Sequence, residues 1–100
     1  MMNLNFAQKQ KLAKLTHFQQ SVLFECARIP KGQTRTYTQL ARAIGKPKAV
    51  RAVANALAIN PLAPHIPCHR VIRKDGSLGG YSGRGGIKAK RRLLNAETNV

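Results

Sequence analysis

The sequence predicts a mainly α-helical fold: a winged-helix-like domain built on a helix-turn-helix, with a short β-hairpin. Residues 36–45 and 48–60 are two short amphipathic segments joined by a Gly-Lys-Pro turn, a pattern typical of a helix-turn-helix. The segment PCHRVI ends in β-branched residues, and the Asp75-Gly76 pair that follows it is a hairpin turn signal. A last amphipathic segment, residues 87–97, predicts a helix after the hairpin.

Length and composition predict one folded domain over residues 17–100, preceded by a basic arm or weak helix over residues 1–16. The chain is 43% hydrophobic and has no Trp, so its core should be aliphatic. Eighteen Lys and Arg against three acidic residues give a formal net charge of +15. This charge favours a polyanionic partner, nucleic acid first, and leaves a ribosomal-type or membrane-surface protein as alternatives.

The cysteines and the lack of long apolar runs indicate a cytoplasmic protein. Cys26 and Cys68 do not make a disulfide framework. Cys26 lies in an apolar stretch and is interpreted as a buried small hydrophobe, whereas Cys68 is expected to be a free thiol. The N-terminus lacks the apolar core of a signal peptide, and no run is long enough to span a membrane, so we expect no membrane partner.

Local signals set the expected limits of the first two helices. From Phe18, apolar residues recur at every fourth position, which predicts a helix that ends before Pro30. Thr36 and Gln39 have the spacing of a capping box, and Gly45 suits the end of the helix that they open.

The second helix of the pair has an apolar face and a small outer face. Val53 and Leu57 fall on the apolar side, whereas Ala52 and Asn55 lie elsewhere and are small. A helix with small outer residues can approach a sugar-phosphate wall closely. We therefore assign this face to DNA, together with Lys48, the cation that opens the helix. A solvated surface helix is the alternative.

The Cys-His-Arg triplet behind three prolines is the stretch that indicates chemistry. A neighbouring base or cation activates a thiol as a nucleophile, and His69 and Arg70 follow Cys68 directly. Adjacent residues of a strand point to opposite faces, so Cys68 and His69 need a local turn or a bridging water to cooperate. A histidine base also needs an orienting carboxylate, and Glu97, which follows the last apolar positions of its helix, could face inward. The alternatives are a buried structural pair, a Cys-His hydrolase and a zinc site, although paired ligand spacing is missing.

Several motifs occur together along most of the chain: IPKGQTRTYTQLARAIGKPKAVRAVANALAINPLAPHIPCHRVI, then GSLGGYSG and KRRLLNAE. From about Phe18 to Glu97 the sequence thereby resembles the C-terminal DNA-binding and active-site domain of the O6-alkylguanine-DNA alkyltransferases. The resemblance implies direct reversal of damage in double-stranded DNA bound through its minor groove. An alkylated guanine is flipped out of the stack, and its alkyl group moves to a cysteine in a single turnover. The resemblance implies no cofactor and no metal.

The resemblance also implies roles for individual residues. Cys68 would accept the alkyl group, His69 would generate its thiolate through a water, and Glu97 would orient His69. Arg51 would enter the base stack in place of the flipped guanine. Tyr37 would contact the 3′ phosphate and the base.

Further positions would complete the pocket. Asn60 would be the hinge between the recognition helix and the Cys68 loop. Tyr81 and Ser82 would border the alkyl pocket. The carbonyl groups near Cys68 and Val71 would read the edge of the guanine.

The sequence departs from the family pattern in three ways. Only about sixteen residues precede the resemblance, where the family usually has an N-terminal domain. The stretch after Gly83 is two residues longer than usual, which bears on whether Lys90 is the lysine that opens the family's last helix. Ala54 stands where the family often has glycine.

A related class, the alkyltransferase-like proteins, shares the DNA-binding domain and the compact length but lacks the acceptor cysteine. Such proteins bind a lesion and pass it to another repair pathway. Our second hypothesis is therefore a lesion-binding protein with a repair-protein partner, and the third is an unrelated basic helix-turn-helix regulator. The presence of Cys68 favours the enzyme.

Overall fold

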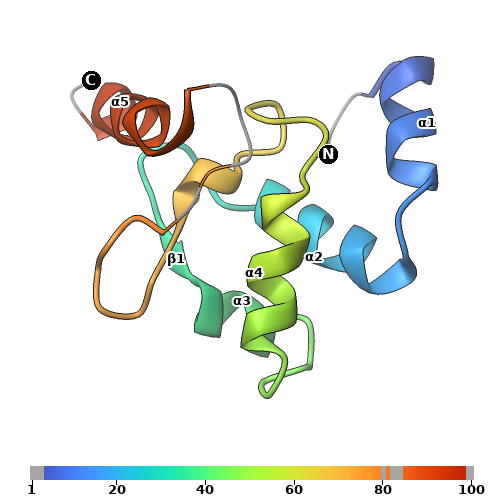
Figure 1. Ribbon diagram of the computed structural model, residues 1–100, viewed down its shortest axis with the longest axis horizontal. Coiled ribbons are helices and arrows are strands. Elements are labelled where there is room, and N and C mark those ends of the chain that lie inside the picture. The colour runs from blue at the N-terminus through green and yellow to red at the C-terminus, as the bar shows by residue number, and fades with distance from the viewer. Residues whose placement is uncertain (1–3, 80, 82–84, 99–100) are drawn as a thin grey trace.

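The computed structural model describes residues 4–79, 81 and 85–98, and helices dominate these ranges (Figure 1). In chain order the elements are α1 (Phe6–Ala13), α2 (His17–Ala27), β1 (Arg35–Thr36), α3 (Tyr37–Ala43), α4 (Val50–Ala58), the 3₁₀ turn η1 (Cys68–Arg70), β2 (Val71–Ile72) and α5 (Gly86–Thr98). The mainly helical fold that the sequence predicts is confirmed. None of these helices has both the length and the apolar character needed to cross a lipid bilayer.

The centre of the core lies where α2, α3 and α4 contact one another. On α2, the side chains of Val22, Leu23 and Cys26 are fully buried, as are Ala41 on α3 and Val53 on α4. These side chains belong to one continuous apolar cluster. The cluster holds the α3–α4 pair in a fixed orientation on α2.

The predicted capping box opens α3. Thr36 Oγ1 accepts the Gln39 N–H at 3.0 Å, and the Gln39 side chain accepts the Thr36 N–H at 2.8 Å. The reciprocal pair satisfies two backbone donors that the start of a helix would leave unpaired. The next helix, α4, begins two residues later than the sequence predicts, after Ala49, so Lys48 lies in the preceding turn.

The strand that follows Cys68 pairs differently from the expectation. β2 lies parallel to β1, a strand from before the helix pair, with Arg35 opposite Val71 and Thr36 opposite Ile72. The predicted β-hairpin is therefore wrong. Parallel strands need a long connection, and here the whole helix-turn-helix provides it. The pairing brings the Cys68 segment beside the start of α3.

A tight turn forms at Asp75, but no second strand follows it among the described residues. The Arg73 N–H donates to the Ser77 carbonyl at 2.9 Å across the turn. Beyond the turn, the Leu78 carbonyl accepts a hydrogen bond from Lys90 Nζ on α5. The Leu78 carbonyl is therefore bonded to a buried cation and not to a neighbouring strand, as it would be in a β-hairpin.

The first helix, α1, is a short element opened by its own capping box. Leu12 is the one buried residue within this fully described helix, and Phe6 is 77% exposed. Gln20 on α2 holds the end of α1, because its Nε2 donates to the carbonyls of Leu12 at 3.1 Å and Leu15 at 3.0 Å. Leu12 and these two hydrogen bonds hold the C-terminal end of α1 to the domain, and Leu4, just before the helix, also packs against the core.

Replacing Thr36 with alanine should lower the free energy of unfolding by about 1 kcal/mol, because α3 loses its N-cap hydrogen bond. Urea denaturation followed by circular dichroism measures the change. The matched control is Thr34→Ala, since Thr34 is exposed and its side chain makes no hydrogen bond in the described part of the chain. The control should stay within about 0.5 kcal/mol of the wild type. Equal losses in the two variants would contradict the capping role.

Candidate active site

Cys68 occupies the first position of η1, where the sequence predicts a short strand. The Cys68 N–H donates to the Ile66 carbonyl at 2.8 Å, and the Arg70 N–H donates to the Pro67 carbonyl at 2.9 Å. These bonds curl the backbone, so the strand begins only at Val71. The strand prediction is wrong for the Cys-His-Arg triplet because Pro67, with ψ of 63°, turns the chain before it extends.

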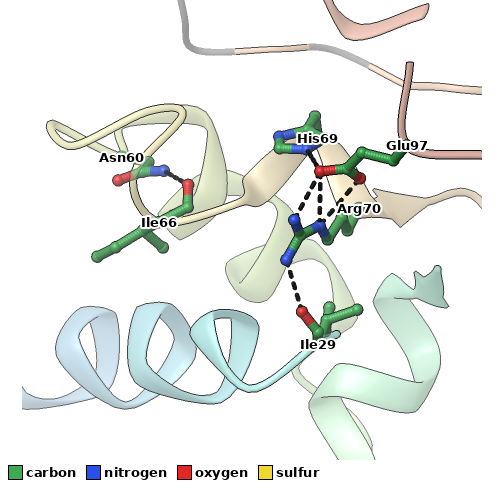
Figure 2. Close-up of polar contacts among 6 residues, drawn as sticks. All are labelled: Ile29, Asn60, Ile66, His69, Arg70 and Glu97. Carbon is green, nitrogen blue, oxygen red and sulfur yellow. Dashed lines mark hydrogen bonds and ion pairs between the residues drawn. The ribbon is translucent and has the colours of Figure 1, made fainter. Parts of the chain in front are cut away.

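The segment ahead of Cys68 is fastened by Asn60, which follows the end of α4 (Figure 2). Asn60 Nδ2 donates to the Ile66 carbonyl at 2.9 Å, and Asn60 Oδ1 accepts the Leu62 N–H at 3.0 Å. The residue is 5% exposed, so water competes little for these bonds. Asn60 therefore couples the end of α4 to the backbone two residues before Cys68.

His69 and Arg70 converge on one carboxylate, that of Glu97 on α5 (Figure 2). His69 Nε2 lies 3.0 Å from Glu97 Oε2. Arg70 donates from Nε to Glu97 Oε1 at 3.0 Å and from Nη2 to Oε2 at 2.6 Å. Arg70 Nη1 also donates to the Ile29 carbonyl at 2.7 Å, just beyond α2. The cluster ties η1, α5 and the end of α2 together.

The electrostatics of this cluster keep Glu97 ionised. The hydrogen-bonded Arg70 guanidinium, with His69 adding a smaller effect, lowers the pKa of Glu97 to about 2. The side chains of His69 and Glu97 are only 3% and 11% exposed, so solvent and salt screen their interaction weakly. A carboxylate held in this state can stabilise positive charge on the imidazole.

The second ring nitrogen of His69, Nδ1, is buried and has no hydrogen-bond partner among the residues that the structure describes. The ring edge of His69 also meets Tyr81, whose ring centroid lies 6.4 Å away at an interplanar angle of 84°. A buried polar nitrogen without a partner costs free energy. Nδ1 is therefore suited to receive a small polar molecule.

A cavity of about 670 Å³ opens beside Cys68, between α4 and residues 73–79. Its walls include three of the expected site residues, Tyr37, Arg51 and Cys68. The other lining residues are mostly apolar or small: Val50, Ala54, Leu57, Ala58, Arg73 and Gly79. A mostly apolar cavity of this size, with a few convergent polar groups, is typical of a small-molecule or base-binding site.

Tyr37, the first residue of α3, reaches the cavity from the strand side. A Cβ atom at Gly79 would lie 2.9 Å from Tyr37 Oη, so a larger residue there would have to displace the tyrosine ring. On the α5 side, Lys90 Nζ lies 5.8 Å from the centroid of the Tyr37 ring. Burial, and then the neighbouring Cys68, raise the pKa of the Tyr37 hydroxyl, which therefore stays a hydrogen-bond donor.

The two cysteines form no disulfide and have different surroundings. Cys26 is fully buried in the core, and burial raises the pKa of its thiol far above the ordinary value. Cys68 is 5% exposed and lines the cavity, so a ligand can reach it. Within residues 4–79, 81 and 85–98, no group of three His, Cys, Asp or Glu side chains is placed to hold a metal ion.

The residues assigned to DNA lie on the outside of the α4 region. Arg51, Ala52 and Asn55 are exposed along α4, and Lys48 is exposed in the turn before it. Of these four residues, Arg51 also lines the cavity.

Two of the three residues expected at the pocket border are not among its described lining residues. Val71 is fully buried and is not among the described lining residues, and its carbonyl accepts a hydrogen bond from Lys90 Nζ at 2.7 Å. Tyr81 packs against His69. Ser82 lies outside the described residues, so its expected place in the pocket border stays a prediction.

Residues 17–99 match a sequence model for the DNA-binding domain of 6-O-methylguanine DNA methyltransferase. The chain belongs to the 6-O-methylguanine DNA methyltransferase family. That this domain is the C-terminal one of longer family members stays a prediction.

Sequence relatives within the family are longer than this chain. Ada of Escherichia coli K12, a bifunctional transcriptional activator and DNA repair enzyme, is 58% identical over 82 residues, which cover 82% of this chain and 23% of Ada. The chain spans between 44% and 54% of the length of several proteins named methylated-DNA–protein-cysteine methyltransferase.

Two solved structures of related proteins share the fold. OGT of Mycobacterium tuberculosis, in complex with DNA, has a TM-score of 0.81 and 48% identity, covering 86% of this chain and 52% of that chain. Atl1 of S. pombe, in complex with damaged DNA containing O6-carboxymethylguanine, has a TM-score of 0.70 and 27% identity, covering 84% of this chain and 78% of that chain.

Two residues, Arg70 and Lys90, hold the site together through contacts that the sequence did not predict. Arg70 was considered only as local positive charge, yet it binds Glu97 and the Ile29 carbonyl. Lys90 is fully buried and holds the carbonyls of Val71 and Leu78. A signal for Lys90 exists in the sequence, because it lies one helical turn before Leu94 on the amphipathic α5.

The Glu97 cluster predicts a loss of stability in acid. Because the folded-state pKa of Glu97 is about 2 against an ordinary 4.5, its contribution is present above pH 4.5 and is lost as pH falls toward 2. The shift corresponds to about 3 kcal/mol. Urea denaturation at a series of pH values should show this loss in the wild type and a flatter profile in Glu97→Gln. Glu25→Gln, on the surface of α2, should keep the wild-type profile; a wild-type profile in Glu97→Gln would refute the assignment.

Proposed function

We propose that this protein is a single-turnover DNA alkyltransferase, which moves the alkyl group of an O6-alkylguanine in double-stranded DNA to Cys68. The observation that carries the proposal is the position of Cys68 in the wall of a base-sized cavity, with the Glu97-bound His69 next to it. Family membership supports the same reaction. No cofactor is needed, because the thiol itself is the acceptor.

The proposed transfer is a nucleophilic displacement at the alkyl carbon. The Cys68 thiolate attacks that carbon, a sulfur–carbon bond forms, and the bond between the carbon and guanine O6 breaks. The electron pair of the broken bond stays on the guanine, which takes up a proton. Since the thioether is not easily reversed, each molecule acts once.

His69 is proposed to generate the thiolate through a water. Its Nε2 is engaged by Glu97, whereas Nδ1 is buried without a partner in the described part of the chain. A water between Nδ1 and Cys68 Sγ would satisfy this nitrogen and carry the thiol proton to it. The ionised Glu97 would then stabilise the imidazolium, as an orienting carboxylate does in other triads.

The DNA side of the proposal rests on α4. A guanine inside a duplex cannot present O6 to a buried thiol, so the nucleotide has to leave the stack. Arg51 lines the cavity and is exposed on α4, which suits a side chain that fills the space left in the duplex. Tyr37 would donate from its hydroxyl, and Asn60 would hold the Cys68 segment against the end of α4.

A lesion-binding protein without transfer is the second candidate. The fold shared with Atl1 supports it, because the Atl1 structure is a complex with damaged DNA containing O6-carboxymethylguanine. A binder of this kind would need a repair-protein partner to complete the repair. The reachable thiol beside His69 favours transfer over this alternative.

Incubation with a short duplex carrying one O6-methylguanine should add the mass of one methyl group in place of a proton. Intact-mass spectrometry measures this, and peptide mapping should place the group on Cys68. Cys68→Ser should bind the duplex without any gain, whereas Cys26→Ser, the matched control, should gain the methyl group as the wild type does. Binding of the lesion by an unmodified wild type would establish the second candidate instead.

Arg51→Ala should slow transfer from duplex DNA more than transfer from the free modified base. Unstacking a base costs a few kcal/mol, so the rate on duplex should fall by about tenfold or more, with little change on the free base. Quenched time courses with both substrates measure the two rates. Arg42→Ala is the control, because Arg42 is an exposed cation on α3 outside the described cavity lining. Equal losses on duplex and free base would contradict the role of Arg51.

A further inference from the structure

A second hollow of about 650 Å³, here called the α5 groove, lies between residues 73–79 and α5. Its lining residues are Arg73, Gly76, Ser77, Leu78, Gly79, Ile87 and Arg91. Arg73 and Gly79 also line the Cys68 cavity, so the two hollows meet along a shared rim. In Figure 1 the segment that forms this rim is the orange loop beyond β2.

The α5 groove is cationic, because its described lining has two arginines and no acidic residue. Arg73 and Arg91 are both exposed, and neither forms an ion pair within the described ranges. Asp75 is outside the lining and accepts hydrogen bonds from Ser77, from its N–H at 2.9 Å and its Oγ at 2.7 Å. Glu97, the acid of α5, is bound inside the site by Arg70. Both groove arginines are therefore available to an anion.

We infer that the α5 groove binds the phosphodiester backbone of the DNA strand whose altered base enters the Cys68 cavity. Arg73 and Arg91 each contact phosphate oxygens, since the planar guanidinium fork matches phosphate geometry. Ile87, which is 51% exposed in the same groove, contacts the deoxyribose between them. The inference rests on the proposed function and extends its DNA interface from α4 to α5.

We favour DNA over an acidic protein as the ligand of the α5 groove because the groove and the Cys68 cavity share a rim. A nucleotide that turns out of the duplex draws its flanking phosphates toward the mouth of the cavity. The strand then has to cross a rim, and the rim shared with the groove carries Arg73. Gly76 leaves open space at the outer end, because a Cβ built there meets no atom within 4 Å. A backbone can therefore pass close to the loop.

The test compares two neighbouring arginines of α5. Arg91 lines the groove, whereas Arg92 is also exposed but is not among the described lining residues. Fluorescence anisotropy with a duplex carrying one O6-methylguanine gives the dissociation constant over a series of salt concentrations. We expect Arg91→Gln to bind at least about threefold more weakly and to lower the salt slope by about 0.9, the value of one lost phosphate contact. Arg92→Gln should keep the wild-type slope, and Arg91→Lys should restore most of it.

The outcomes separate this inference from the proposed function. If the wild type takes up the methyl group while Arg91→Gln and Arg92→Gln share one salt slope, the groove inference is wrong and the proposed function stands. If the wild type does not bind the duplex, both are wrong. If Arg91→Gln weakens binding of poly-glutamate but not of the duplex, the groove serves an acidic protein and the inference is overturned. Circular dichroism melting curves confirm that each variant is folded.

Discussion

The carboxylate of Glu97 is the group on which the arrangement of the site depends. It receives Arg70 through three nitrogen–oxygen contacts and His69 through one, and Arg70 continues to the Ile29 carbonyl. Three segments that are distant in sequence are joined in this way. A buried ion pair repays its desolvation only when its hydrogen bonds are nearly complete, which is the case here. The sequence has only two other acidic residues, Glu25 and Asp75, so few side chains could take over the role of the Glu97 carboxylate.

The segment between α4 and α5 shows how irregular backbone can be held rigidly. Apart from η1 and the two residues of β2, its described part forms no helix or strand. Side chains from the flanking elements bind its carbonyls instead: Asn60 takes that of Ile66, and Lys90 takes those of Val71 and Leu78. Burial lowers the pKa of Lys90 to about 8, because a cation is less stable away from water. Loops that carry chemistry need such a scaffold, because positioning error lowers rates steeply.

Local sequence patterns predicted the helices, but they did not predict contacts between residues that are distant in the sequence. The capping box at Thr36 and the buried face of Val53 and Leu57 follow from spacing alone, since the relevant contacts lie within four residues. The parallel pairing of β1 with β2 and the dual attachment of Arg70 join residues far apart, so no local spacing reports them. Asn60 was singled out only through the resemblance to a family, because a lone asparagine before a proline reads as an ordinary turn residue.

The burial of Glu97 also shapes how the molecule behaves in solution. With that carboxylate turned inward, the described outer surface keeps only Glu25 and Asp75 as side-chain anions against a formal net charge of +15. Copies of the chain repel one another, and each folded copy carries the cost of crowding like charges together. A polyanion that neutralises this surface removes the cost in the folded state. Because the polyanion binds the folded state, the bound domain has a higher free energy of unfolding than the free one. The melting temperature of the domain therefore depends on whether a polyanion is present.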